Sequence, residues 1–162
     1  MKKIDKDGLL LCEMQANVFE KSVVNIDSSS DIFVRRFMHS GIAKKFDDKS
    51  ILNTNLQVND VLDLIIEEYG ETSYGSVKYT KNEMFWMGYI YRYFAYTYGF
   101  STLDVYRTIK PKELRGLFLT YHTFDPSEAI ERIMEAKGLL LNDDEKFDRQ
   151  YQIFKRIRKE SI

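Results

Sequence analysis

The sequence predicts an all-α protein: a single compact bundle of about seven or eight helices around a central aromatic-rich helix at residues 81–98. Apolar residues recur at intervals of three and four along most of the chain, the spacing of an amphipathic helix. Helix-capping side chains precede several of these stretches, and the 162 residues contain only two prolines. Because period-two alternation and linkers are lacking, we expect residues 1–162 to form one domain, with 142–162 as a peripheral C-terminal helix.

The composition predicts a soluble protein with a sizeable core. A chain of 162 residues buries about 70% of its unfolded surface, and 44% of these residues are hydrophobic. Cys12 is the single cysteine, which rules out an internal disulfide or a cysteine-based zinc cluster and suits a reducing compartment. Neither a signal peptide nor a membrane-spanning stretch is visible. We therefore expect a cytoplasmic protein without a metal, a cofactor or a membrane partner.

Three helices are predicted in the first seventy residues. Apolar residues with helical spacing place the first helix at about 9–24. Serines 28–30 offer N-caps for a second helix, which we expect to continue beyond Gly41 to about residue 46. After a polar loop at 47–55, a third and strongly acidic helix begins near residue 58, and Gly70 is expected to end it as a left-handed cap.

The second half of the chain carries clearer helix boundaries. Residues 70–80 lack periodicity and are expected to form an ordered surface loop or a short extended piece. A capping box and a glycine then delimit the helix at 81–98, and a last helix is expected from about Asn142. Between these two helices, three further starts are marked by capping residues or by a proline at the first helical position: Ser101-x-x-Asp104, Pro111 and Asp125-Pro126-x-Glu128.

The helix at 81–98 is apolar nearly all round, and eleven of the 23 aromatic residues lie between residues 79 and 106. Such a helix is normally enclosed by its neighbours, although an aromatic face is also typical of a base-stacking platform or a partner groove. Gly88 and Ala95 form a narrow seam where another helix could approach closely. Arg92 interrupts the apolar surface and needs acceptors, which the acidic third helix could supply.

Arg115 and His122 are the first candidates for chemistry. Six residues separate Arg115 from His122. An arginine and a histidine with four to six residues between them at a helix end are typical of HEPN-type ribonucleases, in which histidine transfers protons and arginine stabilises phosphate charge. Gly116 stands where these enzymes usually carry a polar residue. A histidine that merely bonds to a helix end is the competing interpretation.

A helix-turn-helix for DNA binding is a second candidate, at residues 91–110. Ala95, Gly99 and Val105 occupy the offsets expected for its first helix, turn and second helix. An ordinary helical hairpin explains the same pattern. In the DNA-binding interpretation, four residues would contact the DNA: Ser101, Thr102, Arg107 and Lys110.

Basic residues gather at the end of the chain and could meet a partner protein. Residues 1–80 carry ten basic and thirteen acidic side chains, whereas residues 81–162 carry fourteen and twelve. Arg35 and Arg36 with His39 form a smaller basic group, suited to an acidic partner or to phosphate. The residues expected to bind a partner are Arg149, Tyr151, Phe154, Lys155, Arg156 and Arg158, together with Ile157 and Lys159.

Four stretches together resemble a group of small bacterial proteins: 30–38 (SDIFVRRFM), 86–93 (WMGYIYRY), 105–114 (VYRTIKPKEL) and 121–125 (YHTFD). This group is associated with toxin–antitoxin-type operons that also encode ADP-ribosyltransferase-like toxins. The resemblance covers about residues 9–137, and it implies an antitoxin or accessory role without an active site to carry over.

No glycine-rich phosphate loop, no paired metal-ligand motif and no nucleophile turn is present. The leading hypothesis is therefore a non-enzymatic protein-interaction module, antitoxin-like or accessory, that binds and restrains a partner protein such as a neighbouring toxin. A DNA-binding operon regulator that uses residues 91–110 and a HEPN-like ribonuclease that uses Arg115 and His122 remain the alternatives.

Overall fold

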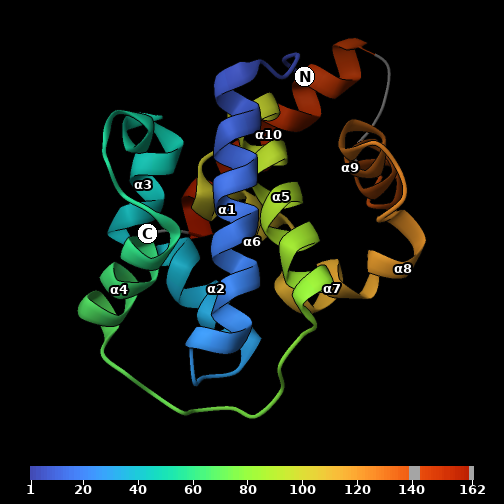
Figure 1. Ribbon diagram of the computed structural model, residues 1–162. Coiled ribbons are helices and arrows are strands. Elements are labelled where there is room, and N and C mark those ends of the chain that lie inside the picture. Colours follow the sequence, from blue (N-terminus) through green and yellow to red (C-terminus); the bar gives the residue numbers. More distant parts are fainter. Residues whose placement is uncertain (139–142, 161–162) are drawn as a thin grey trace.

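The computed structural model describes the backbone of residues 1–138 and 143–160, and the side chains of residues 1–138 and 151–159. Within these residues the chain forms ten α-helices, one short 3-10 helix and no strand (Figure 1). Eight of the ten α-helices have seven residues or more, which confirms the predicted all-α bundle. None of the described helices is both long enough and apolar enough to cross a membrane.

The first half of the chain contains one more α-helix than the sequence predicts. Its elements are α1 (Lys6–Asn25), α2 (Ser30–His39), α3 (Gly41–Asp47), the 3-10 helix η1 (Ser50–Asn53) and α4 (Val58–Tyr69). The expected single helix across 30–46 is wrong, because Ser40 has an extended backbone and its hydroxyl accepts a hydrogen bond from Ala43 N at 3.2 Å. Ser40 therefore ends α2 and caps α3.

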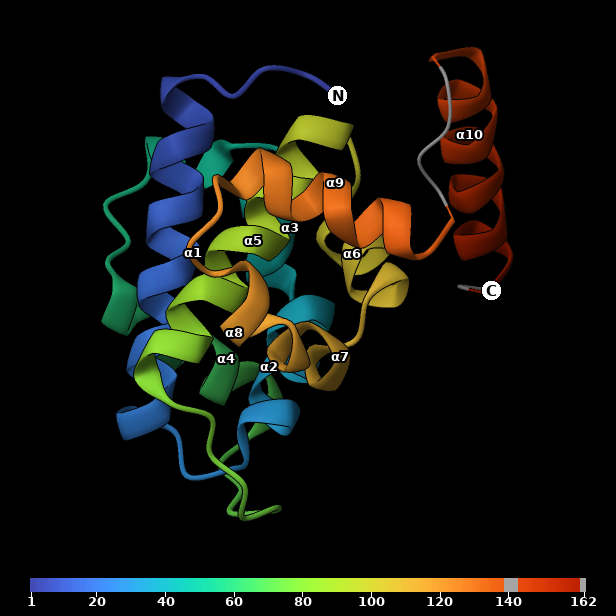
Figure 2. The ribbon, with the colours of Figure 1, turned by 90° about the vertical axis from the view of Figure 1, so that its right-hand side faces the viewer.

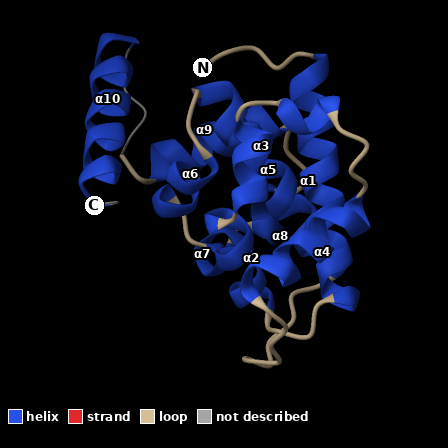
Figure 3. Ribbon diagram, turned by 90° about the vertical axis from the view of Figure 1, so that its left-hand side faces the viewer, coloured by secondary structure: helices blue, strands red, loops and turns tan. Residues whose placement is uncertain are grey.

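Two further details of this half differ from expectation. The segment 47–55 is not wholly a polar loop, because η1 turns Ile51 into the core, where it is 2% exposed. Gly70 has the positive φ expected of a helix-ending glycine, but its ψ of 162° is extended rather than left-handed helical. Glycine tolerates this conformation, so the chain leaves α4 directly into the long loop at 70–80 (Figure 3).

In the second half of the chain, α5, α6, α7 and α9 begin where the sequence predicts, and the structure adds the short helix α8, which the sequence did not predict. Capping boxes start α5 at Thr80 and α6 at Ser101, and prolines occupy the first positions of α7 and α9. The predicted start of the last helix near Asn142 lies outside the described residues. The elements are α5 (Lys81–Tyr98), α6 (Thr102–Thr108), α7 (Pro111–Gly116), α8 (Phe118–Tyr121), α9 (Pro126–Ala136) and α10 (Asp143–Glu160).

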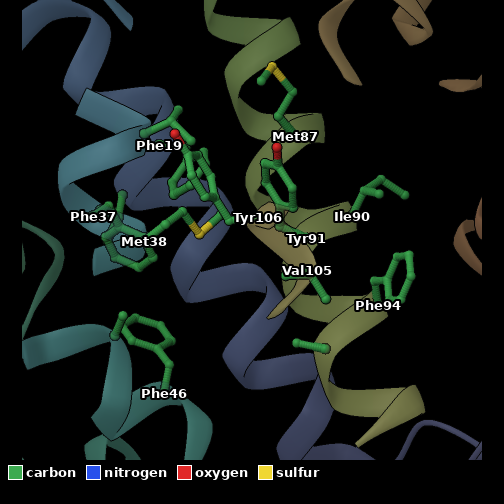
Figure 4. Close-up of a cluster of buried hydrophobic side chains, with 14 of the residues drawn as sticks. Phe19, Phe37, Met38, Phe46, Met87, Ile90, Tyr91, Phe94, Val105 and Tyr106 are labelled. Carbon is green, nitrogen blue, oxygen red and sulfur yellow. The ribbon is translucent and has the colours of Figure 1, made fainter. Parts of the chain in front are cut away.

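Helix α5 is the central element, as predicted, and α1 is its most extensive neighbour. Helix α5 lies inside the bundle with α1 beside it toward one side, and α2–α4 and α7–α9 are placed around α5 (Figures 1 and 2). Buried aromatic rings fill the space between α1, α2, α3 and α5 (Figure 4). Phe19 meets Phe37 edge to face at 5.2 Å between ring centroids, a favoured arrangement of two rings.

Gly88 allows the close approach of α1 and α5. A Cβ atom at this position would lie 2.9 Å from the carbonyl oxygen of Gln15 and 2.9 Å from Cγ of Phe19. Ala95, seven residues further along, is 2% exposed. The predicted small-residue seam is therefore part of the core, and α1 is the helix that packs against it at Gly88.

Arg92 lies inside this core, and each nitrogen of its guanidinium donates a hydrogen bond. Its Nε donates to Gln15 Oε1 at 2.8 Å, Nη1 to Asp47 Oδ1 at 2.8 Å, and Nη2 to the hydroxyl of Thr102. Burial lowers the pKa of Arg92, and the charge of Asp47 opposes that shift. The acidic helix that was expected to supply the acceptors is α4 in the structure. This expectation is wrong, because the acceptors belong to α1, α3 and α6.

We expect Gly88→Ala to lower the stability by about 1–3 kcal/mol, because the new methyl group would press on the backbone of α1. Gly116→Ala is the matched control, since a Cβ at this exposed helical position meets nothing within 4 Å. Chemical denaturation of both variants measures the difference. Equal stabilities would show that the seam is not tightly packed.

Asp47→Ala should cost about 3 kcal/mol or more, because it leaves the buried guanidinium of Arg92 without a counter-charge. Glu128→Ala, which breaks the exposed ion pair with Arg132, should cost no more than about 1 kcal/mol. Denaturation curves of the two variants test the contrast. A loss for Asp47→Ala as small as that for Glu128→Ala would contradict a structural role for the buried pair.

Candidate functional site

An open groove lined mainly by aromatic and apolar side chains runs between α5, α8 and the start of α9. Its volume is about 530 Å³, within the range of sites that hold ligands or peptide segments. We call it the aromatic groove. It is lined by Asn82, Phe85, Trp86, Tyr89, Ile90, Phe118, Leu119, His122, Phe124 and Pro126.

The spacing of residues on α5 explains one wall of the groove. Positions 82, 85, 86, 89 and 90 differ by three, four, seven and eight, so they share one face of the helix. Phe85, Trp86 and Tyr89 are only partly buried, although the sequence places them in a helix that is apolar nearly all round. This face of α5 is therefore covered incompletely, so the prediction that neighbouring helices enclose α5 does not hold there.

Helix α8 and the turn that follows it form the opposite wall. Phe118 meets the Trp86 ring edge to face at 5.8 Å and stacks on His122 at 4.4 Å. These contacts hold α8 against α5 across the floor of the groove. Leu119 points away from the core and is 84% exposed, the largest exposed fraction among the large hydrophobic residues of the described chain.

His122 lies on the groove with one ring nitrogen already used. Its Nδ1 is 2.7 Å from the carbonyl oxygen of Phe118, and a carbonyl can only accept, so Nδ1 carries the hydrogen. Nε2 is then left to face other groups at the groove. This geometry matches the helix-end histidine that the sequence offered as the alternative to a nuclease.

Arg115 is held by a different set of partners. Its Nε donates to Glu83 Oε2 at 3.1 Å, and its guanidinium lies 4.3 Å from the centroid of the Tyr79 ring. Partial burial opposes ionisation of Glu83, but hydrogen bonds from Thr80 N–H and from Arg115 lower its pKa. Arg115 therefore acts as the counter-charge of a helix-capping carboxylate, and it does not line the aromatic groove beside His122.

Most of the residues predicted to contact DNA are engaged in interactions within the protein. Ser101 caps α6 through Asp104 N, and the hydroxyl of Thr102 bonds to Asp47 while the residue is 2% exposed. Arg107 is partly buried and makes an interaction within the protein. Lys110 is exposed, with its ammonium 4.2 Å from the centroid of a tyrosine ring. Helix α6 contacts α2, α3, α5 and α10, which leaves little of it open to a DNA groove.

The predicted partner-binding helix, α10, stands at the edge of the molecule (Figure 2). Ile153 and Ile157 are buried against the domain, and Phe154 stacks on Phe100 at 6.2 Å. Tyr151 is 58% exposed. Basic side chains cover the outer surface: Lys155, Arg156, Arg158 and Lys159 are exposed, whereas the side chain of Arg149 lies outside the described residues.

Sequence reasoning missed the groove residues of α8. Phe118 and Leu119 belong to a short apolar run that follows Gly116, and such a run is normally read as core. The available signal was the length of this run, since three apolar residues between Gly116 and Thr120 are too few for a helix that is buried on all sides. Among the described residues, no three His, Cys, Asp or Glu side chains are grouped so that they could hold a metal ion.

Comparison with known proteins finds no family model, no curated protein and no solved structure that matches the chain. The geometry of its own surfaces therefore carries the functional reasoning.

We expect the purified protein to leave RNA intact, because His122 and Arg115 have separate partners and the groove beside His122 carries no cation for a phosphate. Incubation with a mixed-sequence RNA, followed by electrophoresis, tests this expectation. Cleavage that persists in His39→Ala but disappears in a folded His122→Ala variant would favour the ribonuclease instead.

Proposed function

We propose that this chain is a non-enzymatic protein-interaction module, and that its aromatic groove binds an amphipathic helix of a partner protein. The observation that carries the proposal is the half-covered face of α5, where Phe85, Trp86 and Tyr89 line an open groove beside the exposed Leu119. Large aromatic side chains with part of their surface exposed are the residues that contribute most to protein interfaces.

The chemistry of the groove favours an apolar occupant. None of the side chains that line it carries a formal charge at neutral pH when His122 is neutral, so a partner's apolar residues could displace water without desolvating a charge. Asn82 and Nε2 of His122 supply polar groups beside the rings, which suits the polar edge of an amphipathic segment.

The shape favours a helix over an extended peptide. A peptide that adds to a sheet needs an unpaired strand edge, and the described residues contain no strand. A groove between helices instead accepts the apolar face of another helix, whose side chains at intervals of three and four enter between the rings.

The resemblance to proteins of toxin–antitoxin-type operons supports a neighbouring toxin as the partner, which the chain would bind and restrain. The basic outer face of α10 is a second contact surface in this proposal. Its exposed Lys155, Arg156 and Arg158 would accelerate encounter with an acidic partner, whereas the apolar groove would supply most of the affinity.

Co-expression with the protein encoded beside this chain tests the proposal. Leu119→Glu should weaken the complex by about 30-fold or more, the effect of losing an interface residue worth about 2 kcal/mol. The melting temperature should stay within a few degrees, because Leu119 is 84% exposed. Titration of the purified partners measures the affinity, and growth of the co-expressing cells reports restraint of the toxin.

Two control variants separate the surfaces. Val24→Glu places the same charge at an exposed position near the end of α1 and should leave the affinity unchanged. Reversal of Lys155, Arg156 and Arg158 to glutamate should mainly slow association and reduce its dependence on salt. A complex insensitive to Leu119→Glu would exclude the groove, and the lack of any complex with a neighbouring protein would argue against the antitoxin role.

A further inference from the structure

A second hollow, of about 640 Å³, lies on a different part of the surface, between α2, the end of α4 and the loop at 70–80. We call it the basic pocket. The side chains that line it include two arginines and no acidic residue, in contrast to the aromatic groove, which is lined by neither arginine nor lysine. The side chains from α2 are Ile32, Arg35, Arg36 and His39, and those from the other two segments are Tyr69, Thr72 and Tyr74.

The register of α2 puts its basic residues on one face. Positions 32, 35, 36 and 39 follow the spacing of a single helical stripe, and the next positions around the helix, Phe33 and Phe37, are buried in the core. The core residues therefore fix the rotation of α2, and this rotation directs both arginines and the histidine to the same side.

Arg36 is held in position by two consecutive residues at the end of α4. Its Nη1 donates to the carbonyl oxygen of Gly70 at 2.8 Å, and its guanidinium lies 5.5 Å from the centroid of the Tyr69 ring. One edge of the guanidinium is thereby used, and its other N–H groups remain available. A guanidinium with a fixed orientation loses little further freedom when it binds an oxyanion.

Arg35 and His39 present further polar groups to the pocket. The side chain of Arg35 is exposed and makes no hydrogen bond or salt bridge to any described residue. The Nδ1–H of His39 donates to the carbonyl oxygen of Arg35 at 2.8 Å. Nε2 has no hydrogen-bond partner among the described residues and becomes a donor when the ring is protonated.

The loop wall of the pocket is fixed to α2 as well. Ser29 N donates to the Tyr74 carbonyl at 3.0 Å, and Gly75 has a φ of 78°. A Cβ at Gly75 would lie 2.6 Å from Ser29 Oγ, so the loop passes too close to α2 for any other residue. Thr72 and Tyr74 thus keep their positions, and the Tyr74 ring is 72% exposed beside the arginines.

Two carboxylates beside the pocket have other partners, and a third, Glu71 of the loop, forms no salt bridge with Arg35 or Arg36. Glu68 accepts hydrogen bonds from Gly41 N at 3.1 and 3.3 Å, and Asp31 accepts one from the hydroxyl of Tyr79. Neither carboxylate forms a salt bridge with Arg35 or Arg36 among the described residues. The positive charge of the pocket is therefore left to an external anion.

We propose that the basic pocket binds a mononucleotide, with its phosphate on Arg35, Arg36 and His39 and its base stacked on Tyr74. Two guanidinium groups, together with the imidazole when it is protonated and Nε2 carries a hydrogen, match the oxygens of a phosphate monoester. An exposed tyrosine ring offers a face to a base, whichever base it is. The volume of the hollow is that of a small-molecule site.

Isothermal titration with adenosine 5′-monophosphate, inorganic phosphate and adenosine tests the assignment. Adenosine monophosphate should bind, phosphate should bind more weakly, and adenosine should bind weakest. Arg35→Gln should weaken the binding of adenosine monophosphate at least about tenfold, the effect of losing one hydrogen bond to a charged group. Tyr74→Ala should weaken the binding of adenosine monophosphate and leave that of phosphate unchanged.

Matched variants elsewhere on the surface serve as controls. Arg132→Gln removes the same charge from α9, and Tyr151→Ala removes an exposed ring from α10. Both should bind adenosine monophosphate like the unmodified protein. No binding at millimolar concentration, or an equal loss in Arg35→Gln and Arg132→Gln, would overturn the site. An unchanged affinity in Tyr74→Ala would overturn the assignment of a nucleotide.

Discussion

The hydrogen-bonding requirement of the buried Arg92 is the constraint on which this bundle depends. A guanidinium deprived of water needs an acceptor for its donors, and here each acceptor belongs to a different helix: Gln15 of α1, Asp47 of α3 and Thr102 of α6. Gln15 is fixed a second time, because its Nε2 donates to the carbonyl of Gly88 at 3.0 Å. Sliding or rotating any of these helices would separate a charge from its partners, so the network sets their register in a way that apolar packing alone does not.

Both candidate sites are formed by faces of helices whose other faces build the core. Helix α5 turns Gly88 and Arg92 toward α1 and leaves Phe85 and Tyr89 to the aromatic groove. Helix α2 likewise buries Phe33 and leaves its arginines to the basic pocket. The core thus fixes the rotation of each helix about its axis, and this rotation determines where each site lies. The two sites differ in character because the exposed face of α5 is aromatic and that of α2 is basic.

The sequence predicted what depends on neighbouring residues and failed where distant segments meet. The start of α5 was readable because Thr80 and Glu83 satisfy each other's backbone amides within four residues. The acceptors of Arg92 were misassigned, since two of the three come from positions 45 and 77 residues away. The helix break at Ser40 has a local cause, the serine cap of α3. It was missed because apolar residues with helical spacing on both sides of Ser40 predicted one continuous helix. Neither pocket could be predicted as a whole, because each has walls from segments that are distant in the sequence. The loop at 70–80 lies beside α2, and α8 lies beside α5, only in the folded protein.

The pairing of α1 with α5 also has a consequence for biosynthesis. Gln15 contacts Arg92 and the Gly88 carbonyl across 77 and 73 residues of sequence. At ribosomal rates of about 5–20 residues per second, α5 follows α1 by roughly 4–15 s. During that delay the side chains that α1 will bury against α5, among them Leu11 and Phe19, have no partner from that helix. Helix α1 must therefore wait for its main packing partner, and its apolar face stays exposed on the nascent chain for several seconds.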